Sequence, residues 1–220
     1  MERLVRSNVT LLKYFDFISV IKAKIESVTG KRWSIPTREE YAQWCQGSSW
    51  PFLSFPGYDY FAYLRHHGFP SPLLDWTSSP YIAAHFAMID TPKDAIGKVA
   101  VYAYLEYAGG VKVSDHRGPT IQSLGPYVTT HKRHYIQQST YTICTSEEGS
   151  DLSYANHERV VSANSRGQDM LWRLDIPTSE RLNFLAELEL MNINSFSLFE
   201  TDEKLMEHIY ISEVLLGNHL

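Results

Sequence analysis

The sequence predicts an α+β protein whose mixed or antiparallel central sheet is flanked by helices. Three observations lead to this class. Apolar residues recur at helical spacing near the start of the chain, alternation marks strands in the middle, and capped helical patterns return toward the end. Helices and strands do not alternate strictly, which argues against a doubly wound parallel sheet.

Length and composition predict one globular domain over residues 1–220. The 220 residues are 44% hydrophobic and 20% charged, as in ordinary folded proteins. We expect a helical part over about 1–66 and a sheet-containing part over about 67–220. The net charge of −5 excludes a broad basic face that grips nucleic acid. With no signal sequence and no membrane-spanning apolar run, we expect a soluble, cytoplasmic protein without a membrane partner. Cys45 and Cys144 are expected to be free thiols.

The first third of the chain predicts three helices. Apolar spacing indicates a helix from Thr10 to about Val28, ended by Gly30. The TREE sequence at residues 37–40 is typical of a capping box, which starts a helix to about Gln46. A further helix is expected over 58–65.

The remaining elements are expected from alternation and capping residues. LLDW at 73–76 reads as a short buried strand, and Ser79 with Pro80 starts a helix to about Ile89. Strands are expected over 97–107, 135–144, 168–176 and 196–199, and residues 111–113 are expected to start a partner strand. Residues 114–131 and 145–167 are expected to be irregular. Helices capped by Ser179 and by Thr201 or Asp202 complete the chain.

The densest polar and aromatic stretch surrounds Asp75. This carboxylate lies between Leu74 and Trp76, so we expect it to be at least partly buried and to need donors or a cation. It could equally accept bonds that are purely structural. A metal site would combine His66, Asp75 and His85, but this spacing matches no known ligand set. The sequence carries neither a GxGxxG nor a GxxxxGK[ST] phosphate loop.

These residues carry a family resemblance. The sequence HHGFPSPLLDWTSSPYIAAHFA at 66–87 resembles the signature of the FRG domain, a bacterial and phage module. Downstream, the stretch from Arg133 to Tyr141 resembles the family's Arg-x-x-x-Gln strand, with Gln137 at its glutamine. A weaker similarity covers MNINSFSLFETDEKLM at 191–206, where Met191-Asn192 replaces a Gly-containing turn.

FRG domains resemble ADP-ribosyltransferases distantly, which implies a fold and a site. The resemblance implies that His66 and Gln137 are catalytic, and that NAD, as a substrate, is bound by Arg133 and the strand-to-helix residues. Those residues are Asp75, Trp76, Thr77, Ser78 and Ser79. Hydroxyl groups at a strand-to-helix turn suit phosphate or ribose. Cleaving the bond to nicotinamide passes through an oxocarbenium-like state, which needs stacking and charge placement.

The resemblance leaves alternatives open. The leading hypothesis is an NAD-dependent ADP-ribosyltransferase that modifies a protein or nucleic-acid target, in phage defence or as a toxin. The second is an inactive FRG binding or sensor module, and the third a metal-assisted hydrolase or nuclease. The family's Phe/Tyr-Arg-Gly motif has no counterpart near Met1. The Arg-Gly pairs of the chain, Arg117-Gly118 and Arg166-Gly167, fall in expected loops, so that motif is expected upstream or its role is absent.

Overall fold

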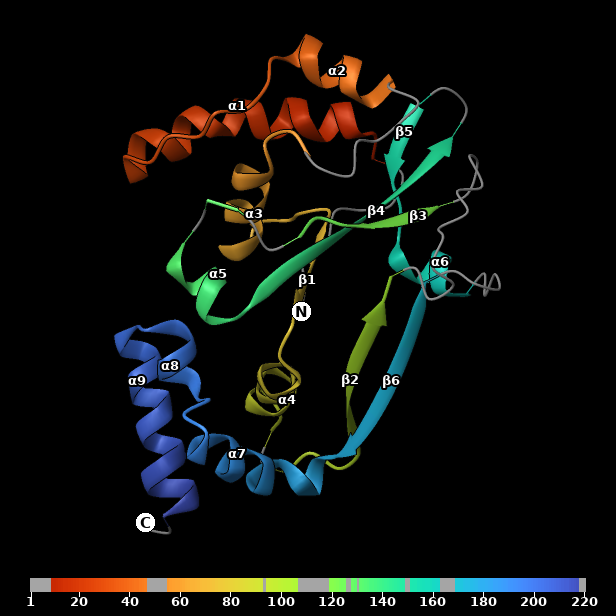
Figure 1. Ribbon diagram of the computed structural model, residues 1–220. Coiled ribbons are helices and arrows are strands. Elements are labelled where there is room, and N and C mark those ends of the chain that lie inside the picture. The colour runs from red at the N-terminus through yellow and green to blue at the C-terminus, as the bar shows by residue number, and fades with distance from the viewer. Residues whose placement is uncertain are drawn as a thin grey trace. The chain divides into compact units, whose positions relative to one another are not determined.

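A computed structural model describes residues 9–46, 55–92, 94–106, 119–125, 128–129, 131–148, 151–162 and 169–217. The chain divides into two units, each assembled from segments far apart in sequence (Figure 1). Unit 1 comprises Met1–Asp75, Glu106–Thr130 and Thr140–Met170, and unit 2 comprises Trp76–Leu105, His131–Ser139 and Leu171–Leu220. The expected Arg-Gly pairs at 117–118 and 166–167 and the strand start at 111–113 lie outside the described residues.

Three helices of unit 1 begin and end close to where the sequence predicts: α1 (Leu11–Thr29), α2 (Arg38–Gln46) and α3 (Tyr58–His66). A fourth described helix, α6 (His157–Ser162), lies in a segment expected to be irregular. The hydroxyl of Thr10 accepts a hydrogen bond from Lys13 N, and Gly30 ends α1 with a φ of 70°. Residues 37–40 form the expected capping box, because Thr37 Oγ1 accepts from Glu40 N and Glu40 accepts from Thr37 N.

The sheet of unit 1 contains β1 (Leu73–Thr77), β3 (Thr120–Ser123), β4 (Ser139–Glu148) and β5 (Asp151–Tyr154). Its order is β1-β4-β3, and β5 also pairs with β4. The pairs of β4 with β3 and with β5 are antiparallel, with Ile121 opposite Cys144 and Thr145 opposite Tyr154. The α+β class and antiparallel pairing are therefore confirmed, whereas the expectation of one domain over 1–220 stays a prediction.

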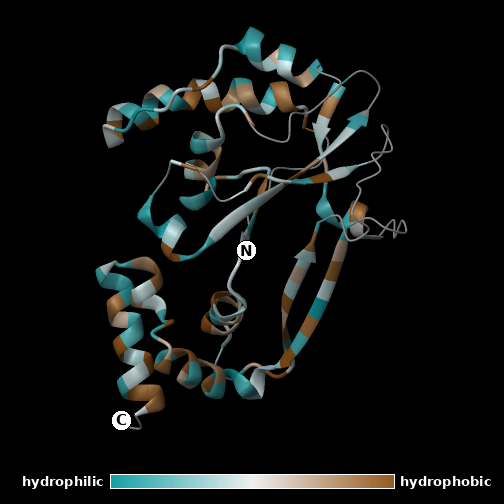
Figure 2. Cartoon of the chain, in the orientation of Figure 1, coloured by the Kyte–Doolittle hydropathy of each residue, from teal (hydrophilic) through white to brown (hydrophobic). Residues whose placement is uncertain are grey.

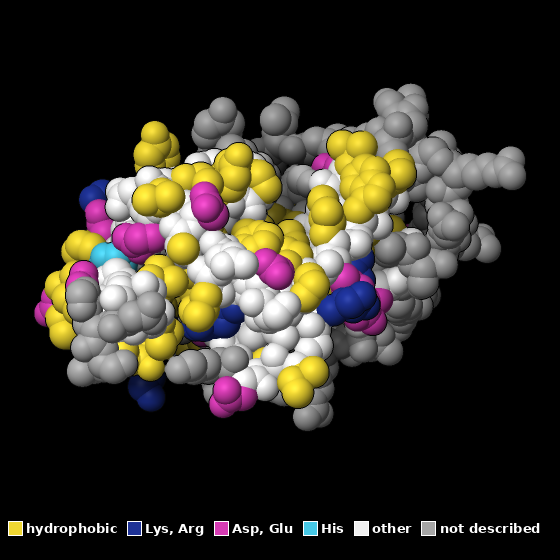
Figure 3. All heavy atoms as spheres, turned by 90° about the horizontal axis from the view of Figure 1, so that it is seen from below, with side chains coloured by type: hydrophobic (Ala, Val, Ile, Leu, Met, Phe, Trp, Pro, Cys, Tyr) yellow, Lys and Arg dark blue, Asp and Glu magenta, His cyan; other side chains and the backbone are white. Residues whose placement is uncertain are grey.

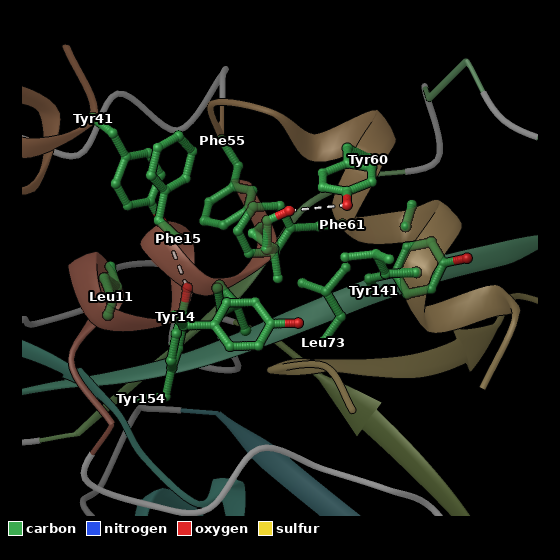
Figure 4. Close-up of a cluster of buried hydrophobic side chains, with 14 residues drawn as sticks. Leu11, Tyr14, Phe15, Tyr41, Phe55, Tyr60, Phe61, Leu73, Tyr141 and Tyr154 are labelled. Carbon is green, nitrogen blue, oxygen red and sulfur yellow. Dashed lines mark hydrogen bonds between the residues drawn. The ribbon is translucent and has the colours of Figure 1, made fainter. Parts of the chain in front are cut away.

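Aromatic side chains fill the core of unit 1 (Figure 4). Phe15 of α1 stacks on Tyr41 of α2 with ring centroids 4.1 Å apart, and Tyr14 meets Tyr154 edge to face. Two tyrosine hydroxyls of this core donate hydrogen bonds to backbone carbonyls: Tyr14 donates to Pro70 O, and Tyr60 donates to Ile18 O. The core thereby ties α1, α2 and α3 to the sheet and fixes the start of β1, because Leu73 is fully buried within it.

Unit 2 begins at the last residues of β1 and is mostly helical. Its elements are α4 (Pro80–Ile89), β2 (Lys98–Leu105), α5 (Lys132–Ile136), β6 (Met170–Pro177), the 3₁₀ turn η1 (Thr178–Glu180), α7 (Arg181–Leu190), α8 (Ser195–Phe199), α9 (Asp202–Ile209) and the π-helix η2 (Tyr210–Leu216). Strands β2 and β6 pair with each other, and hydrophobic and polar residues alternate along β6 in Figure 2. Met88, Leu185 and Ile211 form its core, and Arg181 donates to two carbonyls at the end of α4.

Several expected elements are wrong, each for a local reason. Residues 196–199 form α8 rather than a strand, because Asn194 and Ser197 make a reciprocal capping box. The expected strand 135–144 begins only at Ser139, since His131 caps the short helix α5. Strand β3 lies within 114–131, while β4, β5 and α6 occupy much of 145–167. Ser179 lies inside η1 and does not cap α7.

Candidate functional site

The expected site residues fall into the two units. His66 and Asp75 belong to unit 1, whereas Trp76, Thr77, Ser78, Ser79, Arg133 and Gln137 belong to unit 2. Within unit 2, hydrogen bonds join Thr77 to Gln137 and Gln137 to Arg133, whereas in unit 1 His66 contacts His67 and Asp75 contacts Arg65. We therefore treat the two groups in turn.

The carboxylate of Asp75 pairs with a buried arginine in unit 1. Arg65 Nε donates to Asp75 Oδ2 at 2.8 Å, with side-chain exposures of 6% for Arg65 and 46% for Asp75. Asp75 is thus partly buried and paired with a cation, as expected, although position 75 lies on the same face of the β1 pleat as the fully buried Leu73. The buried member of the pair is the guanidinium, which must be satisfied by a carboxylate at the surface.

His66 ends α3 close to this ion pair in sequence. It is partly buried, and its ring centroid lies 6.0 Å from that of His67, with the planes at 76°. His67 in turn stacks against Tyr63 at 4.3 Å, within an aromatic group that also holds Trp33. This end of α3 is therefore an aromatic and imidazole surface, suited to stacking on a planar ligand.

Several hydrogen bonds fix the turn from β1 to α4 in unit 2. Thr77 Oγ1 donates to Gln137 O at 2.8 Å and accepts from Ser79 N at 3.1 Å. Ser78 N donates to Gln138 O, and Ser79 Oγ caps α4 by accepting from Ile82 N. The hydroxyls of Thr77 and Ser79 thus hold the turn, and the exposed hydroxyl of Ser78 is left for a ligand.

Trp76 begins unit 2 on this turn. Its ring centroid lies 5.4 Å from that of Tyr104 on β2, with the planes inclined at 30°. The indole is partly exposed. An aromatic pair beside a polar turn offers a stacking surface next to donors, as nucleotide ligands require.

Gln137 lies at the end of α5 rather than on a strand, which corrects the expected position. Its side chain is 7% exposed, and Nε2 donates to Leu198 O of α8 at 3.0 Å. The next residue, Gln138, has a φ of 48°, so the chain reverses here before β4. The amide of Gln137 therefore fastens α8 to the turn that also receives Thr77.

Arg133 is the cation that this arrangement leaves available. Its guanidinium lies over the ring of Phe199, 5.1 Å from the centroid, and Lys204 lies over the same ring at 5.1 Å. The Nε atom of Arg133 is buried and has no hydrogen-bond partner among the described residues. Lys132 and Lys204 are instead paired, with Glu200 and Glu207 respectively. A guanidinium held flat on a ring is preorganised to bind an anion.

Sequence reasoning missed Phe199 and Lys204. Phe199 was assigned to a short strand, and nothing in the spacing between residues 133 and 199 indicates that the two meet. The capping pair Asn194 and Ser197 was the usable signal, because it turns 195–199 into a helix. Of the described residues, no three histidine, cysteine or acidic side chains are arranged to hold a metal ion, and Cys45 and Cys144 form no disulfide.

Comparison with known proteins gives one match. The family model described as the FRG domain matches residues 16–95, a span that contains most of α1, all of α2, α3 and α4, the Arg65–Asp75 pair and the β1–α4 turn. The resemblance to the FRG domain is thereby confirmed, and the more distant resemblance to ADP-ribosyltransferases stays a prediction. Neither the curated proteins nor the solved structures contain a match. None of the described helices is long and apolar enough to cross a membrane.

Proposed function

We propose, from the FRG domain to which residues 16–95 belong, that this chain binds NAD and transfers its ADP-ribose to a protein or nucleic-acid acceptor. The glycosidic bond between the ribose carbon and the nicotinamide nitrogen would break, and neutral nicotinamide would leave. The same ribose carbon would bond to a nucleophilic atom of the acceptor, which gives up its proton. Such a reaction proceeds through an oxocarbenium-like state that positioned charge stabilises.

The observation that carries this proposal is the guanidinium of Arg133. NAD has a diphosphate, and a planar guanidinium binds phosphate oxygens through two parallel hydrogen bonds. Arg133 is held over Phe199 and has a buried Nε without a partner among the described residues, whereas its neighbour Lys132 is committed to Glu200. Arg133 therefore suits the diphosphate better than either adjacent lysine.

The β1–α4 turn supports the same assignment. Because Thr77 bonds the backbone of Gln137, the turn is fixed to the segment that starts with Arg133. Ser78 offers an exposed hydroxyl, and Trp76 offers a partly exposed ring for a base or the nicotinamide. We assign Trp76, Ser78 and Arg133 to ligand contact, and Thr77, Ser79 and Gln137 to positioning. His66 and Asp75 remain expected participants from unit 1.

A second candidate function is an FRG module that binds a ligand without turnover. The side chain of Gln137 favours it, because this amide is buried and already donates to Leu198 O. A catalytic amide would need to reach the ribose or the acceptor. In this alternative the same surface binds a nucleotide and signals its presence.

The experiment measures NAD binding by calorimetry and nicotinamide release in a cell lysate with labelled NAD. We expect the wild-type chain to bind NAD, and Arg133→Gln to bind it roughly 10- to 100-fold more weakly, as expected for a lost charge-assisted hydrogen bond. Lys132→Gln is the matched control, since it removes the adjacent charge from a residue already paired with Glu200. It should leave the affinity nearly unchanged.

The outcomes separate the two functions. Binding with nicotinamide release and label transfer supports the transferase, and binding without release supports the module. Absence of NAD binding by a folded chain would overturn both, and equal losses in Arg133→Gln and Lys132→Gln would remove Arg133 from the site. His66→Ala then tests the residue from unit 1, because it should abolish release without lowering stability if His66 acts on the substrate.

A further inference from the structure

His85 is a buried histidine in the middle of an apolar helix. It lies on α4, its side chain is 2% exposed, and neither ring nitrogen has a hydrogen-bond partner among the described residues. A buried polar group in this state costs free energy, so its presence calls for a physical explanation. The proposed NAD site does not use this side chain.

A small cavity adjoins His85 where the helices of unit 2 meet. Its volume is about 10 Å³, close to the minimum that one water molecule requires. The lining includes Leu185 of α7, Ser195 of α8, His208 of α9 and Ile211 of η2. The imidazole therefore lies at the point where α4 meets all of these elements.

Charged groups face this point from several helices. They are Asp90 at the end of α4, Glu189 of α7, and Lys204, Glu207 and His208 of α9. Most are engaged with one another, since His208 Nδ1 lies 3.2 Å from Glu189 Oε2 and Lys204 Nζ lies 2.8 Å from Glu207 Oε2. Toward the cavity, α8 contributes Asn194 at its N-terminal cap and Ser195, and η2 contributes Ile211.

The balance of these effects keeps His85 neutral. Burial lowers the pKa of His85 to about 4, although the Glu207 carboxylate acts in the opposite direction. Burial also opposes ionisation of Glu207, but Lys204 and the Ser195 hydroxyl hold the pKa of that carboxyl below its usual range. The negative charge of Glu207 is thus already compensated, and His85 lacks a close counter-ion.

We propose that His85 is an acid-sensitive latch of unit 2. In its neutral form the ring lets α4 pack against α7, α8, α9 and η2. A proton on the ring places a charge in a buried site without a direct partner, so those helices separate from α4 and the imidazolium reaches water.

The direction of the effect follows from linkage. The folded unit binds the proton less readily than the opened unit, where the ring has its ordinary pKa of about 6.5. The stabilisation from the neutral ring is therefore complete above about pH 6.5 and is lost as the pH falls toward 4. Between these values the opened form should gain population.

The latch reaches the site around Arg133 through α8. Ser195 at one end of this short helix lines the cavity, and Phe199 at the other end lies under Arg133. Opening would remove the ring on which the guanidinium rests. The proposed response of His85 to acid needs no ligand, so it can be tested independently of the proposed function.

Hydrogen exchange of the whole chain, read by mass spectrometry at about pH 7 and about pH 5, tests the proposal. Exchange times are scaled for the intrinsic pH dependence of the amide reaction. In the wild type, the segment 181–217 should open roughly 20-fold more often at about pH 5 than at about pH 7, as follows from pKa values of about 6.5 and about 4. Burial lowers the pKa of His157 in unit 1 in the same way, so peptides of unit 1 are read separately and only the change over 181–217 tests His85.

Matched variants assign the effect to His85. His85→Phe keeps a buried ring without a titratable nitrogen, so its exchange over 181–217 should lose the acid dependence. His157→Gln is the control: burial likewise lowers the pKa of His157 to about 4, but this residue belongs to unit 1, so the acid response of 181–217 should persist. If His85→Phe does not fold, His85→Gln serves, because its amide takes up no proton in this range.

Two results would overturn the proposal. One is equal protection of 181–217 at both pH values in the wild type. The other is an acid response in the folded His85 variant as large as in the wild type, which would assign the opening to Glu189, Glu207 or His208.

Discussion

The guanidinium of Arg65 is buried and the carboxylate of Asp75 that receives its hydrogen bond is half-exposed, with Nε and Oδ2 2.8 Å apart. Arg65 belongs to the last turn of α3, and Asp75 is the outward-facing residue of β1. The pair therefore joins the helix before the HHG sequence to the strand after it, within the span 16–95 that the FRG family model matches.

This pair predicts an asymmetric mutational effect. Asp75→Ala should lower the free energy of unfolding by about 1 to 3 kcal/mol, because a buried guanidinium loses its carboxylate partner. Arg65→Met with Asp75→Asn should recover part of this loss, since an apolar chain then fills the buried position. Urea unfolding of the wild type, Asp75→Ala and the double variant measures both effects. A double variant no more stable than Asp75→Ala alone would show that other contacts of Arg65 dominate.

The sequence predicted the elements whose signals are local. Thr10, Thr37 and Ser79 each cap the helix they were expected to start, and the LLDW strand lies where the pattern places it. The signals failed where a local motif competes with a periodic pattern. The residues SFSL alternate like a strand, but Asn194 and Ser197 supply a capping box and the segment becomes α8.

The site was predicted only in part because its geometry depends on contacts between distant segments. The β1–α4 turn was expected from Ser79 and Pro80, but its attachment to Gln137 through Thr77 joins residues sixty positions apart. The contact between Arg133 and Phe199 likewise depends on α8, a helix that the alternating sequence pattern did not predict. The half-exposure of Asp75 depends on how far along β1 the core of unit 1 extends, because Leu73 on the same face is fully buried, and a hydrophobic neighbour on each side does not determine it.

The amide of Gln137 predicts a loss of stability that does not depend on any ligand. Gln137→Met keeps the volume of the side chain but removes the donor to Leu198 O, which is buried in α8. We expect the free energy of unfolding to fall by about 1 to 3 kcal/mol in chemical denaturation. Gln138→Met is the matched control, because Gln138 is exposed and its side chain lies outside this bond. Equal stabilities of the two variants would contradict a positioning role for Gln137.

Glu26 predicts an acid-dependent contribution in unit 1. Lys22, the backbone amide of Trp33 and Arg32 all bond this carboxylate and lower its pKa to about 2. Because the folded pKa lies below the unfolded value, the stabilisation is present above about pH 4.5 and disappears as the pH falls toward 2. Glu26→Gln should therefore be less stable than the wild type near neutral pH and approach it near pH 2 in thermal unfolding. A difference that is constant over this range would show that the lost interaction does not depend on ionisation.

Phe199 predicts a change in ligand affinity through its contact with Arg133. Phe199→Leu keeps an apolar side chain on α8 but removes the ring over which the guanidinium lies. A cation–π contact contributes about 0.5 to 2 kcal/mol, so NAD affinity should fall roughly 2- to 30-fold.

Phe196→Leu is the matched control, since this residue lies on the same helix with its side chain 40% exposed. On the face seen in Figure 3, hydrophobic side chains lie exposed among acidic and basic ones. Calorimetry at fixed salt compares the two variants, and a loss confined to Phe199→Leu would mean that the ring positions Arg133. Equal affinities in all three proteins would show that Arg133, if it binds the diphosphate, does so without its aromatic support.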